Sequence, residues 1–237
     1  MNCLLIDPAE FDPEARRARI VGRRRRHADE ILRASRGDTL SVGLIGGQLG
    51  RAEILGLDDE LLELRVTLER DPPPKRPLSL VLALPRPPVF RRLLSTIASL
   101  GVAELLIVGT ARTEKSFWQS HVIESDEIQA RLLLGLEQAR DTVVPEVGIH
   151  RYFEELVGDV LPAHLARSRG LLAHPGAQVP CPHCVEGEIT LFVGPEGGFI
   201  DYELETLRGI GFESVNLGER VLRVEPVIPL LVGRLFG

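Results

Sequence analysis

Two apolar segments that each end in a glycine-containing loop place the strongest constraint on the fold of this chain. Residues 189–193 form an apolar run that predicts a buried strand, and this run stops at Gly194-Pro-Glu-Gly-Gly198. A second short strand is predicted over residues 214–217, and Gly218 follows it. Glycines at these points tolerate positive φ angles and leave main-chain groups accessible. Two such loops at strand ends predict a pocket lined by main chain, although each loop alone is also typical of a tight turn.

Strands and helices alternate beyond a proline-rich segment. Residues 71–77 read Asp-Pro-Pro-Pro-Lys-Arg-Pro, which is typical of a stiff, extended linker. Strands are predicted over residues 78–84, 104–108, 147–149, 171–173, 189–193 and 214–217, and helices over residues 89–100 and from Ser125 to about Arg140. This alternation predicts an α/β fold with a mostly parallel sheet covered on both faces by helices. We expect a first domain at residues 1–70, a linker at 71–77 and a second domain at 78–237.

The first 70 residues read as short strands separated by turn residues. Residues 42–50 contain four glycines and predict a hairpin connection, and residues 61–68 alternate in the manner of a strand. A small β-barrel is therefore expected. Seven arginines lie between residues 16 and 26, and this cluster fits either a phosphate-binding patch or a solvated charged turn. Residues 1–77 hold 14 Lys and Arg against 14 Asp and Glu, so the net charge of −6 falls on residues 78–237.

Composition and the cysteines exclude several classes of protein. No apolar run approaches the length of a membrane span, and the first residues lack the features of a signal peptide, so we expect a cytoplasmic protein. Three cysteines agree with a reducing compartment. Cys181-Pro-His-Cys184 has the spacing of half a zinc knuckle, but a structural zinc site needs four ligands and no second pair follows. We therefore expect no metal site, and interpret this segment as a surface loop.

The order of several short segments resembles the ribosomal RNA uracil-N3 methyltransferases of the knotted SPOUT superfamily. The matching segments include residues 27–42, Leu-Ala-Leu-Pro-Arg at 82–86, Leu-Gly-Val at 100–102, Thr-Ala-Arg at 110–112, Glu-Lys-Ser-Phe-Trp-Gln-Ser at 114–120, Leu-Glu-Gln-Ala-Arg at 136–140, His-Pro at 174–175, the Gly-Pro-Glu-Gly-Gly loop, and residues 217–225. None of these pieces is specific alone, but their shared order is.

The resemblance implies a fold, a cofactor and partners. It implies a PUA-like RNA-binding β-barrel followed by a SPOUT-type parallel sheet with a C-terminal trefoil knot, two copies pairing as a homodimer, and 16S ribosomal RNA as the substrate, either free or within the small subunit. S-adenosylmethionine is the implied cofactor. Its predicted binding residues are Ala173, His174, Gly194, Glu196, Gly197, Gly198, Leu217, Gly218 and Leu222.

The same resemblance suggests catalytic and RNA-binding residues. Arg223 is the candidate cation that stabilises a developing uracil anion, and Glu225 is the candidate proton acceptor; a structural ion pair between them is the alternative. The predicted RNA-binding residues are Arg23, Arg24, Arg25, Arg26, Arg86, Arg92, Arg112 and Lys115. Phe117 and Trp118 are candidates for stacking on a flipped base, with core packing as the alternative for at least one.

The chain departs from the family pattern at one point that bears on activity. The family's Arg-x-Glu-Thr-Ala becomes Arg223-Val-Glu-Pro226-Val227, so a hydroxyl and a main-chain N–H are lost at Pro226. Methylation of uracil N3 is the expected activity. The alternatives are a ribose-2′-O RNA methyltransferase and a non-catalytic RNA-binding protein on a degenerate SPOUT scaffold.

Overall fold

The computed structural model describes residues 2–237, which divide into two compact units. The first unit comprises the residues up to Pro74 together with Leu133–Val144, and the second comprises Lys75–Leu132 and Pro145–Gly237. The chain therefore passes between the units at three points: between Pro74 and Lys75, between Leu132 and Leu133, and between Val144 and Pro145. Helix α3 (Ser125–Ala139) contributes residues to both units.

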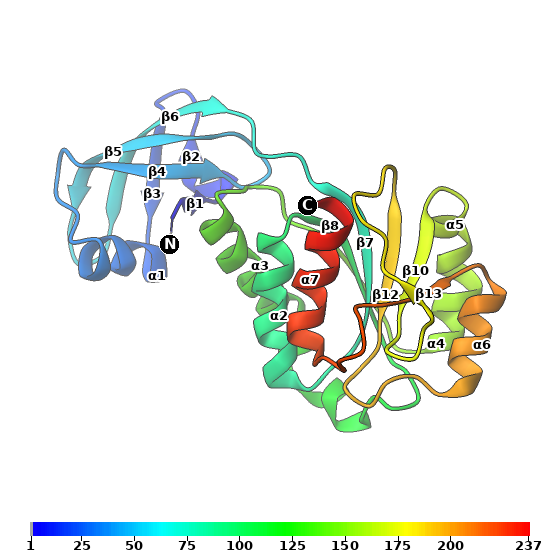
Figure 1. The fold of residues 1–237 in the computed structure, drawn as a ribbon. Coiled ribbons are helices and arrows are strands. Elements are labelled where there is room, and N and C mark those ends of the chain that lie inside the picture. The colour runs from blue at the N-terminus through cyan, green and yellow to red at the C-terminus, as the bar shows by residue number, and fades with distance from the viewer. Residues whose placement is uncertain (1) are drawn as a thin grey trace. The chain divides into compact units, whose positions relative to one another are not determined.

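A six-stranded mixed sheet forms the first unit (Figure 1). Its strands are β1 (Leu4–Ile6), β2 (Phe11–Asp12), β3 (Arg17–Ile20), β4 (Thr39–Leu44), β5 (Leu49–Leu57) and β6 (Leu62–Arg70), in the order β1-β4-β5-β6-β3-β2. Strands β1 and β4 are parallel, and the remaining pairs are antiparallel. The predicted hairpin connection is confirmed, because Leu44 N–H donates to the carbonyl of Gln48 at 2.9 Å.

The core of the first unit lies on the apolar face of this sheet. Leu62, Leu64 and Val66 alternate with exposed or half-buried residues along β6, so a single face of the strand is buried. Helix α1 (Gly22–Arg26) and the turn that follows it bring Ala28 into the same core.

Seven parallel strands form the sheet of the second unit, as the alternation of strands and helices predicts. They are β7 (Arg76–Ala83), β8 (Val102–Val108), β9 (Glu146–His150), β10 (Arg169–Ala173), β11 (Val179–Pro180), β12 (Ile189–Val193) and β13 (Glu213–Asn216), in the order β11-β13-β10-β12-β7-β8-β9. The α/β class and the parallel sheet are thereby confirmed.

Helices cover both faces of this sheet (Figure 1). On one side lie α4 (Phe153–Glu155), α5 (Leu161–Leu165) and α6 (Asp201–Gly209), and on the other α2 (Pro87–Ser99) and α7 (Val224–Phe236), which pack against each other. Helix α2 ends at a left-handed glycine, Gly101, with φ of +73°.

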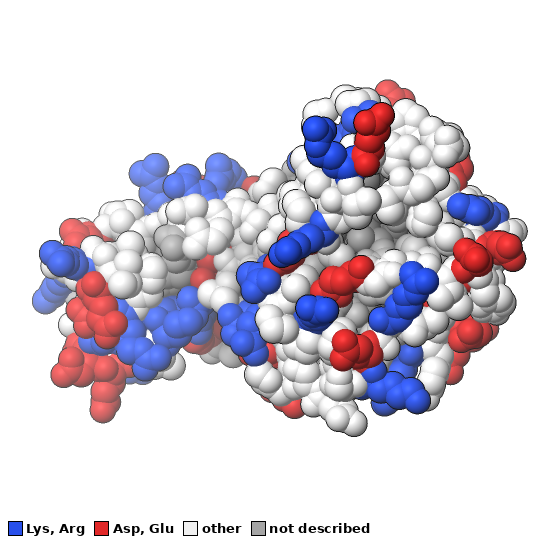
Figure 2. All heavy atoms as spheres, turned by 60° about the horizontal axis from the view of Figure 1, so that its bottom comes forward, with Lys and Arg blue, Asp and Glu red and all other residues white. Residues whose placement is uncertain are grey.

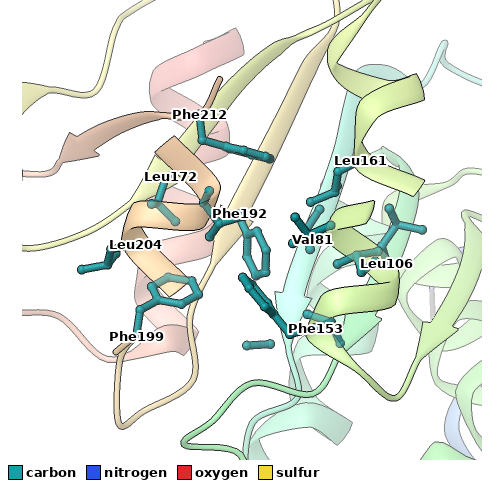
Figure 3. Close-up of a cluster of buried hydrophobic side chains, with 14 residues drawn as sticks. Val81, Leu106, Phe153, Leu161, Leu172, Phe192, Phe199, Leu204 and Phe212 are labelled. Carbon is teal, nitrogen blue, oxygen red and sulfur yellow. The ribbon is translucent and has the colours of Figure 1, made fainter. Parts of the chain in front are cut away.

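Phe192 on β12 lies at the centre of the core beneath α4 and α6 (Figure 3). Its ring meets those of Phe199 and Phe212 edge-on, with centroids 5.3 and 6.1 Å apart. Such aromatic pairs add packing energy beyond the apolar area that they bury. The aromatic cluster therefore fixes the segment after β12, which carries the glycine loop, against the sheet.

Candidate functional site

A cavity of about 350 Å³ lies at the carboxyl ends of β10, β12 and β13. The loops that follow these three strands all line it, as expected for ligand sites of parallel sheets. Every residue predicted to bind a cofactor lies on its wall: Ala173, His174, Gly194, Glu196, Gly197, Gly198, Leu217, Gly218 and Leu222. The structure thus brings together the His-Pro corner and both glycine corners, which lie far apart in the sequence.

The loop after β12 is a tight turn whose shape depends on glycine. Gly198 has φ of +71°, and its N–H donates to the carbonyl of Pro195 at 2.9 Å. A Cβ at Gly194 would lie 2.8 Å from the Phe199 ring, so that position also excludes a side chain. The segment was predicted to form either a tight turn or the wall of a pocket, and in the structure it forms both.

Arg112 closes one side of the cavity and is bonded to the glycine loop. Its Nη1 donates to the carbonyl of Gly197 at 2.5 Å, and a Cβ at Gly197 would approach the Arg112 side chain to 3.1 Å. Arg112 is one of the residues predicted from the sequence to bind RNA. The structure places it on the cavity wall, with its side chain exposed.

His174 is held as a neutral hydrogen-bond acceptor. Its Nδ1 accepts from the main-chain N–H of Gly176 at 3.1 Å, and the main-chain N–H of His174 donates to the carbonyl of Val215 at 2.9 Å. Burial, and then the positive charge of Arg208, lower the pKa of His174 below its ordinary value of 6.5. At neutral pH this corner of the cavity is therefore uncharged.

Asn216, which is not among the residues predicted from the sequence, joins two of the corners. Its Nδ2 donates to the carbonyl of Ala177 at 2.6 Å, and its Oδ1 accepts from the N–H of Gly218 at 2.9 Å. Gly218 has φ of +104°, a conformation that favours glycine. An asparagine two residues before a glycine at a strand end was the available signal, because asparagine often bonds to the main chain two residues on.

Residues 72–234 match the RNA methyltransferase domain family. The chain belongs to this family. It is 28% identical over 209 residues to the ribosomal RNA small subunit methyltransferase E of Treponema pallidum, a match that spans 84% of this chain and 77% of that protein. It is 27% identical over 204 residues to the protein of the same name from Synechocystis, across 83% of this chain and 65% of that protein.

Two solved structures share the fold of this RNA methyltransferase family member. One is a ribosomal RNA small subunit methyltransferase E from Neisseria gonorrhoeae bound to S-adenosyl methionine, with a TM-score of 0.77, 20% identity, and coverage of 97% of this chain and 95% of that one. The other is a methyltransferase from Legionella pneumophila in complex with bound SAM, with a TM-score of 0.76, 22% identity, and coverage of 98% and 95%.

The candidate catalytic residues of this family member lie at the start of α7, beside the cavity. Arg223 is the exposed N-cap residue of α7, and its neighbours Leu222 and Val224 line the cavity. Glu225 is ion-paired with Arg92 of α2, whose Nε donates to its Oε1 at 2.9 Å. The carboxylate thus pairs with an arginine 133 residues away in the sequence. Pro226 is exposed in the first helical turn, where no intrahelical N–H bond is required.

The four arginines at residues 23–26 are predicted to bind RNA, and three of them form ion pairs within the first unit. Arg23 pairs with Glu137 at 2.6 Å, and Arg24 pairs with Glu10 at 2.6 Å. Arg25 is only 7% exposed and pairs with Asp29. Arg26 is exposed. Much of the cluster's charge is therefore balanced locally.

The remaining predicted RNA-binding residues are exposed on the second unit: Arg86, Arg92, Arg112 and Lys115. On the face shown in Figure 2, basic and acidic side chains of this unit are interspersed. A contact with RNA would therefore depend on individual residues more than on a broad positive surface.

The Cys181–Cys184 segment lies against the C-terminal helix. Cys184 N–H donates to the carbonyl of Arg234 at 3.1 Å, and Arg234 Nε donates to the carbonyl of Cys181 at 2.6 Å. Burial raises the pKa of the Cys181 thiol. Within residues 2–237, no cluster of three or more His, Cys, Asp or Glu side chains is arranged to hold a metal ion. Nor does any helix in that range have the length and apolar character needed to cross a membrane.

Proposed function

We propose that this protein transfers a methyl group from S-adenosylmethionine to N3 of a uracil in 16S ribosomal RNA. The observation that carries the proposal is the single cavity enclosed by the loops after β10, β12 and β13, on whose wall every predicted cofactor residue lies. The relatives' names support it, because they are ribosomal RNA small subunit methyltransferases.

The cavity fits a bent nucleoside with a charged tail. Its volume of about 350 Å³ is within the range of small-molecule sites, roughly 300–1,000 Å³. Main-chain groups of Gly194–Gly198 and Leu217 are available for the adenine edge, and the apolar side chains of Val193 and Leu231 are available for its faces. Glu196 adds a carboxylate on the side where a cationic tail would be favoured.

When bound, S-adenosylmethionine supplies an electrophilic methyl group. The residues of this chain position the uracil and remove its N3 proton, since the N3 lone pair is otherwise delocalised. Arg223, exposed at the cavity's edge, stabilises the anion that develops on the uracil oxygens. Glu225 accepts the proton, either directly or through water. Its ion pair with Arg92 of α2 holds the carboxylate in position at the start of α7.

We propose further that the first unit is a PUA-like barrel that binds RNA, through Arg26 and through exchange of the ion pairs of Arg23 and Arg24 for phosphates. Six strands and a small apolar core support a barrel. A trefoil knot in the second unit is supported by the bonds that tie residues 181–185 across the end of α7. Pairing of two copies is supported by the exposed apolar side chains of Val221, Leu222 and Leu230 next to the cavity. A cytoplasmic location follows from a ribosomal substrate.

Deletion of the gene, followed by mass spectrometry of digested 16S ribosomal RNA, tests the proposal. The expected result is the loss of one methyluridine, with restoration by the wild-type gene and not by a Gly198→Val variant. Loss of a sugar-methylated nucleotide would identify a ribose-2′-O enzyme instead, because base and sugar methylation fragment differently. If every methyl mark persisted, the non-catalytic binding protein would replace the enzyme.

A further inference from the structure

A second cavity of about 350 Å³ lies beside the first, at the carboxyl ends of β8 and β9. The turn at residues 110–113 and the segment at residues 199–200 separate the two. Arg112 and Phe199 line the first cavity, whereas Thr113 and Ile200 line the second. Whatever the second cavity binds is therefore held next to the site proposed for methyl transfer, but not within it.

The lining of the second cavity is unusually aromatic for this chain. The protein contains one tryptophan and two tyrosines, and all three, Trp118, Tyr152 and Tyr202, line this cavity. Tyr152 and Tyr202 are 57% and 56% exposed. They come from different elements, since Tyr152 precedes α4 and Tyr202 lies in the first turn of α6. Exposed rings on separate elements around one cavity contribute little to core packing and suit a planar ligand.

Trp118 is fixed in place by its neighbours. A Cβ at Gly109 would lie 2.4 Å from the carbonyl oxygen of Arg151 and 3.2 Å from Cζ2 of the indole, so only a glycine fits beside the ring. The guanidinium group of Arg151 lies over the face of the indole, with its central carbon 6.0 Å from the ring centroid. The indole is thus pre-positioned, and a ligand stacking on it would lose little side-chain entropy.

The cavity wall carries two exposed cations that can contact phosphates of a nucleic-acid chain. Arg151 and Lys115 are exposed cations on its wall. Glu154 is an exposed carboxylate there, and Glu203 is buried with its two oxygens bonded to the main-chain N–H groups of Ala111 and Ile200. The wall therefore holds two cations and two carboxylates, but both cations are exposed, whereas one of the carboxylates is buried and already bonded to main chain.

We propose that this cavity binds an unpaired base of the RNA substrate that flanks the methylated uridine. This inference rests on the proposed function, because it takes RNA as the substrate. Aromatic side chains with adjacent Arg and Lys recognise single-stranded nucleic acid through base stacking and phosphate contacts. The base in this cavity is not the one that is methylated, because the wall at residues 110–113 and 199–200 separates it from the cofactor site.

The tryptophan makes the site directly observable, because Trp118 is the single source of tryptophan emission in the chain. A short single-stranded RNA containing uridine is titrated into the wild-type protein, and its binding is followed in parallel by the anisotropy of a label on the RNA. We expect Trp118 emission to be quenched over the same concentration range as the anisotropy change, and a duplex of the same sequence to quench it far less. RNA that does not bind, or that binds without changing the emission, would overturn the inference.

Variants give a second and independent test. Tyr202→Ala and Tyr152→Ala are each expected to raise the KM for RNA about fivefold or more, while Tyr202→Phe and Tyr152→Phe, which keep a ring, remain near wild type. Ile149→Ala, which removes an exposed apolar side chain outside the cavity, serves as the control. Unchanged KM in both alanine variants would overturn the inference and leave the proposed function intact. Failure of the proposed function has a different signature, namely no methyl transfer and no heat of S-adenosylmethionine binding in the wild-type protein.

Discussion

The buried carboxylate of Glu203 accepts a hydrogen bond from the main-chain N–H of Ala111 at 2.7 Å, across 92 residues of sequence. Its other oxygen accepts from the N–H of Ile200 at 3.0 Å. One side chain therefore ties together the two segments that separate the cavities. Because Glu203 is only 2% exposed, water cannot replace either bond without rearrangement.

Replacing Glu203 with glutamine is expected to destabilise this wall. The amide keeps one acceptor oxygen but turns an NH₂ donor toward the second main-chain N–H. An unsatisfied buried donor costs about 1–3 kcal/mol, and the free energy of unfolding should fall by that amount. Chemical denaturation measures the loss, and calorimetry should show weaker S-adenosylmethionine binding. Glu205→Gln, on the exposed face of the same helix, is the control and should resemble wild type. Equal stability of both variants would mean that the two bonds do not hold the wall.

Replacing Gly198 with valine is expected to abolish cofactor binding while the protein stays folded. The φ of +71° at Gly198 is a conformation that a β-branched residue strongly disfavours, so the turn should open. Titration calorimetry should show no heat with S-adenosylmethionine, and circular dichroism should remain native. Gly209→Ala is the matched control, because a Cβ there meets no atom within 4 Å and Gly209 is not among the glycines with positive φ. Normal binding by the valine variant would remove the glycine loop from the cofactor site.

The sequence predicts the convergence of the loops better than it predicts the contacts among them. The strand at residues 189–193 and the helix beginning at Ser125 have the expected bounds, because local apolar patterns and caps determine them. Parallel strands then bring their carboxyl ends to one edge, and the cavity follows. Bonds such as Glu225 to Arg92 and Arg23 to Glu137 join residues more than a hundred positions apart. The periodicity of the sequence cannot predict these bonds, because they depend on how the helices and strands pack against one another after they form.

Cofactor affinity is expected to weaken as the pH falls through the folded-state pKa of His174, which lies below 6.5, because His174 then becomes protonated. The pKa of His174 is lowered in the folded protein, so its neutral form is the one that the fold stabilises. The associated stability is complete above the unfolded value of about 6.5 and is lost as the pH falls through the lower folded pKa. Protonation of Nδ1 also removes the acceptor for Gly176 N–H and places a positive charge on the wall of the cavity that is proposed to hold a cationic cofactor. Calorimetry across this pH range measures the effect.

Replacing His174 with asparagine distinguishes the effect of the histidine's charge from the effect of its hydrogen bond to Gly176. In His174→Asn, Oδ1 can accept the same N–H two residues on but does not titrate. Binding by this variant should be nearly independent of pH between about 5 and 7, the window that brackets an ordinary histidine. If the variant retained the full pH dependence, another group would be responsible.

Replacing Pro226 with threonine, the family's residue, is expected to change the fold little. Pro226 lies in the first turn of α7, where its missing N–H breaks no intrahelical bond, so the free energy of unfolding should shift by less than about 1 kcal/mol. The informative measurement is the affinity for S-adenosylmethionine. Under the proposed function the affinity should be close to that of wild type. A large gain would instead indicate a scaffold that has lost its cofactor site and would favour the binding protein.

Glu225→Gln and Arg92→Ala distinguish a proton acceptor from a structural ion pair. If Glu225 takes the N3 proton, the glutamine variant should lose about 100-fold or more in kcat with unchanged cofactor affinity. Arg92→Ala should mainly raise the KM for RNA, because it leaves the carboxylate in place and removes an exposed cation. Glu219→Gln, an exposed carboxylate in the loop before α7, is the control. Equal loss of kcat in Glu225→Gln and Arg92→Ala would show that the pair acts as a unit to hold α7 against α2, and the proton acceptor would then lie elsewhere.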